Sequence, residues 1–294
     1  MSDFVKQNST VSNFNSSNSW VILSPIEQSI KSKIEKVGTP LKAWDINIYR
    51  GVLTGYNDAF IISGEKRQQI LDNCNTKDER KRTADLIRPI LRGRDIGRYG
   101  YNFADLYLIN THNGIKEKNI PPINIKDYPA VKEHLDKYWD KISVRADKGD
   151  TPYNLRNCAY MEDFNKPKVV YTPVNSEYKF TLVPEKYVFN NSLFMITGEG
   201  LEIICALCNS SLFQFYLKKI LSSGNYQYGS GNFFENLPLI KIQDKEQQKK
   251  LKMKLLDIQK EYTKSKAIEI DSMIFDLYNL SQEERDKIGY IIIK

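Results

Sequence analysis

Histidine and cysteine are scarce in this chain of 294 residues, which has two His and four Cys. A nucleophilic triad needs a general base, usually histidine, and neither His112 nor His134 stands beside a nucleophile motif such as GxSxG. The sequence therefore disfavours triad hydrolases, and the same shortage of ligands disfavours a transition-metal site. Four cysteines are too few for a disulfide framework, which indicates a cytoplasmic protein.

The one paired-cysteine pattern has no companion. Cys205 and Cys208 form a CxxC inside the apolar segment 201–217, with no second cysteine pair or histidine nearby. Because a structural zinc site needs a full set of protein ligands, we expect two buried helix cysteines here instead.

Long apolar runs and phosphate-binding loops are also missing. No window approaches the roughly 18 apolar residues of a membrane span, and the polar N-terminus has no signal-peptide core. The GxxxxGK[ST] pattern is absent, and Gly198 with Gly200 makes a lone GxG. Since a lone GxG is a weak cofactor signal, we expect a plain turn between a strand and a helix there.

Basic residues, by contrast, are in surplus. Lys and Arg outnumber Asp and Glu by 43 to 36, which gives a net charge of +7 and a pI near 9.0. This surplus favours a polyanionic partner, although many proteins carry such a charge for solubility alone. Hydrophobic residues make up 41% of the chain, which is enough to bury a core.

Capping residues predict a helix near each end of the chain. Ser24 and Glu27 form a capping box, and the apolar spacing that follows predicts a helix ending at Gly38. Ser281 with Glu284 is a second capping box and predicts a short final helix.

Strand and helix patterns alternate through the rest of the chain. Residues 41–63 predict two strands joined by a Gly-rich turn at Thr54–Asp58. Further helices are expected at 66–73, 77–88, 128–146, 200–221, 251–262 and 267–280, and β-rich segments at 105–112, 166–175, 178–184, 187–197 and 237–242. This order predicts an α+β fold with a mixed, twisted β-sheet, flanking helices and a C-terminal helical extension.

Basic and aromatic side chains gather in several predicted loops, where functional residues are commonly found. The stretch ILRGRDIGRYGY at 90–101 holds three arginines that can grip phosphate or a guanine edge. Alternatively, Arg94 forms a surface ion pair with Asp95 worth under about 1 kcal/mol, and the tyrosines belong to the core. The expected nucleic-acid contacts are Thr54, Tyr56, Asn57, Arg92, Arg94, Arg98, Tyr99, Arg145, Lys168, Asn175, Lys179, Tyr226, Gln227 and Tyr228.

An independent enzyme is an alternative from a different class. Asp163, Glu177 and Lys179 loosely follow the order of a magnesium-dependent nuclease site. Such a loose pattern arises often by chance, so the nuclease is the less favoured hypothesis.

Five segments, in this order, resemble the TaqI-like C-terminal specificity domain, which ends many type IIG restriction–modification enzymes and related adenine-N6 DNA methyltransferases. The resemblance runs from about Trp20 to the C-terminus. The segments are INIYRGVLTGYNDAFII, IRPILRGRDIGRYGY, VKEHLDKYWDKISVRADKGDTPYNLRNCAYMEDFNKPKVVY, ICALCNSSLFQFYL and IDSMIFDLYNLSQEE.

The resemblance implies a target-recognition domain, which selects the DNA sequence that a separate catalytic domain methylates or cleaves. The implied partners are double-stranded DNA and a methyltransferase or endonuclease domain or subunit. Full-length members carry an Asn-Pro-Pro-Tyr/Phe tetrad and an S-adenosylmethionine motif, and this chain has neither, since NIPPI at 119–123 has the wrong order. We therefore expect no catalytic or metal-binding residues here, with S-adenosylmethionine and Mg²⁺ held in the separate catalytic domain.

The expected organisation has three parts. Residues 1–19, rich in Asn, Ser and Thr, predict a flexible leader or linker; 20–242 predict the recognition domain; and 243–294 predict a lysine-rich helical spacer or docking segment. The chain is then either the C-terminal piece of a larger enzyme or a free-standing specificity subunit. A scaffold protein whose C-terminal helices dock a methyltransferase is the third hypothesis.

Overall fold

The computed structural model describes residues 23–172, 178–221 and 234–291. Outside them lie the predicted leader 1–19 and the predicted site residues Asn175, Glu177, Tyr226, Gln227 and Tyr228. Contacts divide the chain into two units. The first comprises Met1–Asn47, Pro173–Phe180 and Gly198–Lys294, and the second comprises Ile48–Thr172 and Thr181–Thr197.

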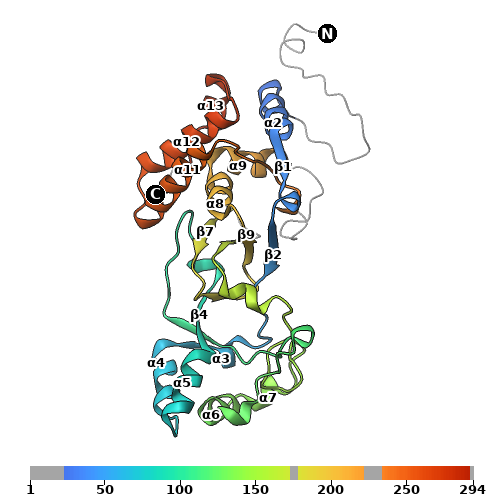
Figure 1. The fold of residues 1–294 in the computed structure, drawn as a ribbon, viewed down its shortest axis with the longest axis vertical. Coiled ribbons are helices and arrows are strands. Elements are labelled where there is room, and N and C mark those ends of the chain that lie inside the picture. Colours follow the sequence, from blue (N-terminus) through green and yellow to red (C-terminus); the bar gives the residue numbers. More distant parts are fainter. Residues whose placement is uncertain (1–22, 173–177, 222–233, 292–294) are drawn as a thin grey trace, which may run out of the picture. The chain divides into compact units, whose positions relative to one another are not determined.

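The first and last described helices meet in the first unit (Figure 1). Helix α2 (Pro25–Val37) contacts α13 (Gln282–Ile288). Ser29 Oγ and Lys33 Nζ donate hydrogen bonds of 2.7 and 2.6 Å to the Glu284 carboxylate. These polar contacts fix the start of the described chain against its end.

A short sheet and a group of helices complete the first unit. Strand β1 (Gly38–Pro40) pairs antiparallel with β10 (Pro238–Ile240), with Thr39 opposite Leu239. The remaining helices are α8 (Leu201–Asn209), α9 (Ser211–Phe215), α11 (Lys245–Lys260) and α12 (Lys264–Leu277). Helix α11 packs against both α8 and α12.

Both predicted capping boxes are confirmed. The backbone N–H of Glu27 donates to Ser24 Oγ at 3.4 Å, and the Glu27 carboxylate accepts from the Ser24 N–H at 2.9 Å. Ser281 and Glu284 repeat this exchange at 3.3 and 2.7 Å. Gly38 directly follows α2, as predicted.

The apolar segment predicted as one helix over 200–221 is broken, and this prediction is corrected. Ser210 has an extended backbone, with φ −61° and ψ 153°, and its Oγ accepts from the N–H of Phe213 at 3.2 Å. Ser210 thus ends α8 and caps α9, and a π-helical turn follows over Tyr216–Leu221. Cys205 and Cys208 are fully buried in α8, which confirms them as core residues.

The second unit contains a mixed four-stranded sheet. Its strand order is β3 (Ile61–Ser63), β5 (Leu106–Ile109), β4 (Ile87–Leu91) and β8 (Val188–Phe189). Strand β5 is antiparallel to both neighbours, whereas β8 runs parallel to β4.

Another four-stranded sheet has the order β2 (Ile46–Arg50), β9 (Phe194–Gly198), β6 (Lys168–Tyr171) and β7 (Phe180–Val183). Strands β6 and β9 are antiparallel, with Val170 opposite Met195. Because β2 and β3 belong to different sheets, the predicted pair of strands joined at Thr54–Asp58 is corrected to two separately paired strands. Helix α3 (Asn57–Phe60) lies between them.

Four further helices belong to the second unit. They are α4 (Gly64–Asp72), α5 (Lys77–Leu86), α6 (Pro129–Asp136) and α7 (Trp139–Ile142). The single helix predicted over 128–146 is therefore wrong. The backbone leaves helical geometry at Tyr138, with φ −111° and ψ 13°, although Val131, Leu135 and Ile142 on the two helices are all buried.

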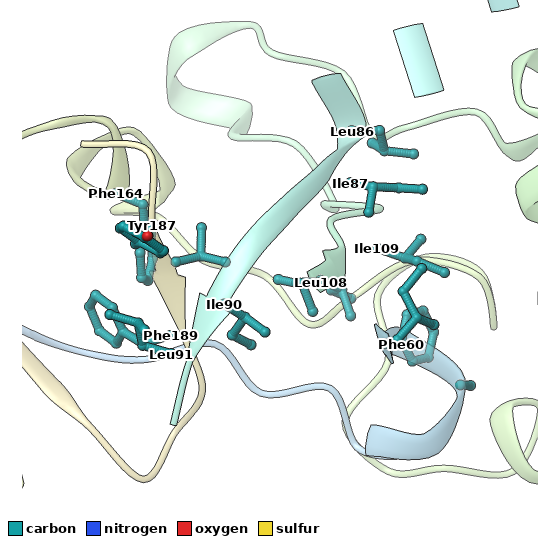
Figure 2. Close-up of a cluster of buried hydrophobic side chains, with 14 of the residues drawn as sticks. Phe60, Leu86, Ile87, Ile90, Leu91, Leu108, Ile109, Phe164, Tyr187 and Phe189 are labelled. Atoms are coloured by element: carbon teal, nitrogen blue, oxygen red, sulfur yellow. The ribbon is translucent and has the colours of Figure 1, made fainter. Parts of the chain in front are cut away.

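Strand β4 runs through the hydrophobic core of the second unit (Figure 2). Ile87, Ile90 and Leu91 lie along it, near Leu108 and Ile109 of β5. The β4 backbone is thereby fixed at the point where it leads into the arginine-rich stretch 90–101.

The elements together make an α+β fold with mixed sheets and flanking helices, as predicted. Within the described ranges, none of the helices is long and apolar enough to cross a membrane. The predicted extents 20–242 and 243–294 stay predictions. The contacts place α11, α12 and α13 in the same unit as α2.

Candidate nucleic-acid interface

Arg145 braces two loops of the second unit. It is buried, and its guanidinium donates to the carbonyl of Thr54 and, at 2.6 Å each, to those of Asp147 and Asn154. Its guanidinium carbon lies 4.4 Å from the ring centroid of Phe60. Burial lowers the pKa of Arg145 to about 10, so it remains charged at neutral pH.

The braced turn presents a polar side chain to solvent. Thr54 is buried and its Oγ1 donates to Asn57 Oδ1 at 2.6 Å, while Asn57 is exposed. Gly55 has φ +67°, and a Cβ at this position would lie 3.0 Å from the carbonyl oxygen of Asp147. The amide oxygen of Asn57 is thus occupied within the turn, and its NH₂ group remains as a donor pair.

Arg92, rather than Arg94, pairs with Asp95 among the described residues. The guanidinium of Arg92 donates to both Asp95 oxygens at 3.0 and 2.9 Å. This partner raises the pKa of Arg92. The charge of Arg92 is therefore compensated inside the loop, whereas Arg94 is exposed.

Arg98 and Tyr99 are both buried in the same loop. The Arg98 guanidinium carbon lies 5.5 Å from the centroid of the Tyr99 ring. Tyr99 has φ +64°, a left-handed conformation that is costly for a bulky side chain. The loop holds this conformation between Ile96 and Tyr101, which form an antiparallel bridge.

The two predicted lysines differ in setting. Lys168 is fully buried in β6, and its Nζ donates to the carbonyls of Pro184 and Tyr187 at 3.2 Å each. Burial, with the nearby charge of Arg88, lowers the pKa of Lys168 to about 7. Lys179 is half-buried and belongs to the first unit, whereas Lys168 belongs to the second.

The predicted nuclease residues are not assembled within one unit. Asp163 lies in the second unit and pairs with Lys166 at 2.7 Å, whereas Lys179 lies in the first. Over residues 23–172, 178–221 and 234–291, no three His, Cys, Asp or Glu side chains gather as a metal site.

Sequence reasoning missed a groove in the second unit. Two neighbouring pockets share Asn110, His112 and Met161 as lining residues, and together they define this groove. Four arginines line this arginine groove, as we call it: Arg50, Arg82, Arg88 and Arg156. Only Arg88 adjoins the arginine-rich stretch 90–101, and the other three come from segments that the fold alone brings together.

Comparison with models of protein families identifies a family for this chain. A family model described as the TaqI-like C-terminal specificity domain matches residues 88–239. No curated protein sequence shows significant similarity to the chain.

Two solved structures match most of this chain. One is the type IIL restriction-modification enzyme MmeI in complex with DNA, with a TM-score of 0.60 and 12% identity, covering 85% of this chain and 35% of that one. The other is the type IIG restriction endonuclease BpuSI, with a TM-score of 0.48 and 13% identity, covering 87% of this chain and 34% of that one. The chain thus spans about a third of the length of either enzyme.

Proposed function

We propose, from the premise that this chain belongs to the TaqI-like C-terminal specificity domain family, that it recognises a specific sequence in duplex DNA for a restriction–modification enzyme. The family match over residues 88–239 is the observation that carries this proposal. A fold similar to that of MmeI, which was solved in complex with DNA, supports it.

The exposed donors of the second unit are the candidates for reading bases. An asparagine amide suits adenine, and an arginine suits guanine, because each can form paired hydrogen bonds to the edge of that base. Asn57 stands on a turn braced by Arg145, and Arg94 stands beside the Arg92–Asp95 pair. We assign base contacts to Asn57 and Arg94, with Tyr56 beside Asn57.

The buried candidates take a supporting role in this proposal. Arg145 and Lys168 are buried and donate to protein oxygens, so contact with DNA would require those bonds to break, and the half-buried Arg92 is paired with Asp95. Arg98 and Tyr99 would likewise shape the loop that carries Arg94.

Chemistry on the DNA would come from another domain or subunit. The chain spans about a third of MmeI or BpuSI. We propose that a methyltransferase or endonuclease domain supplies the S-adenosylmethionine and Mg²⁺ sites, and that the assembly works in the cytoplasm.

A selection experiment tests the proposal. Residues 1–294 would be incubated with a randomised duplex library, and bound DNA would be sequenced over several rounds. We expect one enriched motif, with Asn57→Ala and Arg94→Ala each relaxing a position at a cost of about 1–3 kcal/mol. Arg80→Ala is the matched control, because Arg80 pairs with Asp72 on the surface of the same unit. A library that stays random with the wild-type chain would overturn the proposal.

A further inference from the structure

The arginine groove combines four cationic side chains with a single acidic one. Among the residues that line it, only Asp85 carries a negative charge. Such an excess of one sign in a concave site attracts ligands of the opposite sign. The ligand class is therefore anionic.

At one end of the groove, two guanidinium groups are each anchored through one nitrogen. Arg50 donates through Nε to the carbonyl of Asn191 at 3.2 Å, and Arg156 donates through Nη1 to the Asp147 carboxylate at 2.9 Å. Within the described residues, their other guanidinium nitrogens make no hydrogen bond. The side chains are thus oriented while most of their donors remain available.

The other end repeats this arrangement. Arg82 donates through Nη2 to the carbonyl of Asp127 at 3.2 Å, and Arg88 through Nη2 to that of Glu185 at 3.1 Å. Burial lowers the pKa of Arg88, although an arginine stays charged at neutral pH. Arg88 is half-buried, whereas the other three arginines of the groove are exposed.

The shared middle of the groove supplies neutral donors. The Nδ1 atom of His112 accepts from the N–H of Gly114 at 3.2 Å, so in the neutral imidazole Nε2 carries the proton. Burial lowers the pKa of His112, which favours this neutral form. Asn110 adds an amide beside it.

We propose that the arginine groove holds the phosphodiester backbone of bound DNA, an inference that rests on the proposed function. Guanidinium groups match phosphate oxygens with two parallel hydrogen bonds, and pre-oriented side chains lose less entropy on binding. Backbone contacts set affinity and position without reading sequence. Recognition is then divided between this groove and the exposed donors Asn57 and Arg94.

Salt dependence separates this proposal from base reading. Arg50→Gln, Arg82→Gln and Arg156→Gln would be combined, and Kd would be measured by fluorescence anisotropy on the selected duplex and on a scrambled one, over a series of salt concentrations. The slope of log K against log salt should fall by about 0.9 for each lost phosphate contact, or about 2.7 for three. Both duplexes should lose affinity by the same factor, so the ratio of their Kd values stays constant.

Controls keep each outcome decisive. Arg80→Gln removes an arginine outside the groove and should leave the slope unchanged. Arg88 is left intact in the triple variant because it also braces three carbonyls, and Tm verifies that the triple variant is folded. An unchanged slope in the folded triple variant, or a loss confined to the selected duplex, overturns the groove proposal while leaving DNA recognition standing. A wild-type chain that binds neither duplex overturns the proposed function itself.

Discussion

The Asp95 carboxylate accepts three hydrogen bonds from Arg92, two from its guanidinium and one from its backbone N–H at 2.8 Å. Asp95 is 6% exposed, so most of this pair is removed from water. The pair thus joins two residues of the arginine-rich stretch 90–101 that lie three positions apart. Of the three arginines in that loop, Arg94 is the exposed one.

Removal of the Asp95 charge should destabilise the second unit. Asp95→Asn keeps the shape but loses the charge-assisted hydrogen bonds, at an expected cost of about 1.5–3 kcal/mol in the free energy of unfolding. Urea denaturation measures this cost. Arg94→Ala, at an exposed position, should change stability by less than about 0.5 kcal/mol. Equal effects of the two substitutions would contradict the structure.

Lys168 should make stability depend on pH above neutrality. Its pKa is about 7 in the folded chain and about 10.4 in an unfolded one. Between these values the unfolded state binds more protons, so stability rises with pH by up to about 1.4 kcal/mol per pH unit. Below pH 7 Lys168 is protonated in both states, so its effect on stability no longer changes with pH.

The Lys168 contribution can be isolated by subtraction. Lys168→Met removes the titrating amine and keeps the apolar stem, so the difference between wild type and variant should change with pH from 7 to 9.5. Other groups that titrate in this range cancel in the difference. A difference that stays constant would show that the amine is not buried in its neutral form.

Arg145 should be needed for the order of the turn at Thr54–Asn57. Arg145→Ala leaves several buried carbonyls without their donor, at an expected cost of about 3 kcal/mol or more. The N–H groups of Ile61 and Asn154 hold backbone hydrogen bonds next to the contacts of Arg145, and these amides should exchange faster in the variant. Arg156→Ala, which removes an exposed ion pair, is the comparison and should leave those amides protected.

Gly55 should tolerate no side chain. Gly55→Ala places a Cβ against the Asp147 carbonyl in a left-handed conformation, and we expect a loss of about 1–2 kcal/mol in stability. Gly100→Ala is a matched control in the arginine-rich loop, since no atom lies within 4 Å of a Cβ built there. Thermal unfolding of both variants provides the measurement, and equal Tm values would argue against the braced turn.

Features encoded by a few neighbouring residues were predicted well. Both capping boxes were found because an N-cap serine and a glutamate three residues later satisfy each other locally. The interruption at Ser210 was missed because serine also occurs inside helices. Only the structure shows that its hydroxyl caps the following helix.

Features that depend on distant pairing were out of reach. The arginine groove joins Arg50, Arg82 and Arg156, whose approach is fixed by the tertiary fold and not by spacing. The partner of Asp95 was misjudged because adjacency favoured Arg94, whereas the backbone turn places Arg92 opposite the carboxylate. The burial of Arg98 and Lys168 could not be predicted from the sequence either. Charged side chains are usually exposed, and the sequence does not show which oxygens surround them.

Strands β1 and β10 pair although the second unit lies between them in the sequence, and this limits how recognition units can be exchanged between related proteins. The chain passes between the two units at residues 47, 172, 180 and 197, so the second unit is a discontinuous insertion within the first. A single recombination junction near residue 242 would separate α11 from α8, its packing partner. Grafting a new recognition surface onto this scaffold therefore requires matched junctions at all four crossings, with both strands of the small sheet taken from the same parent.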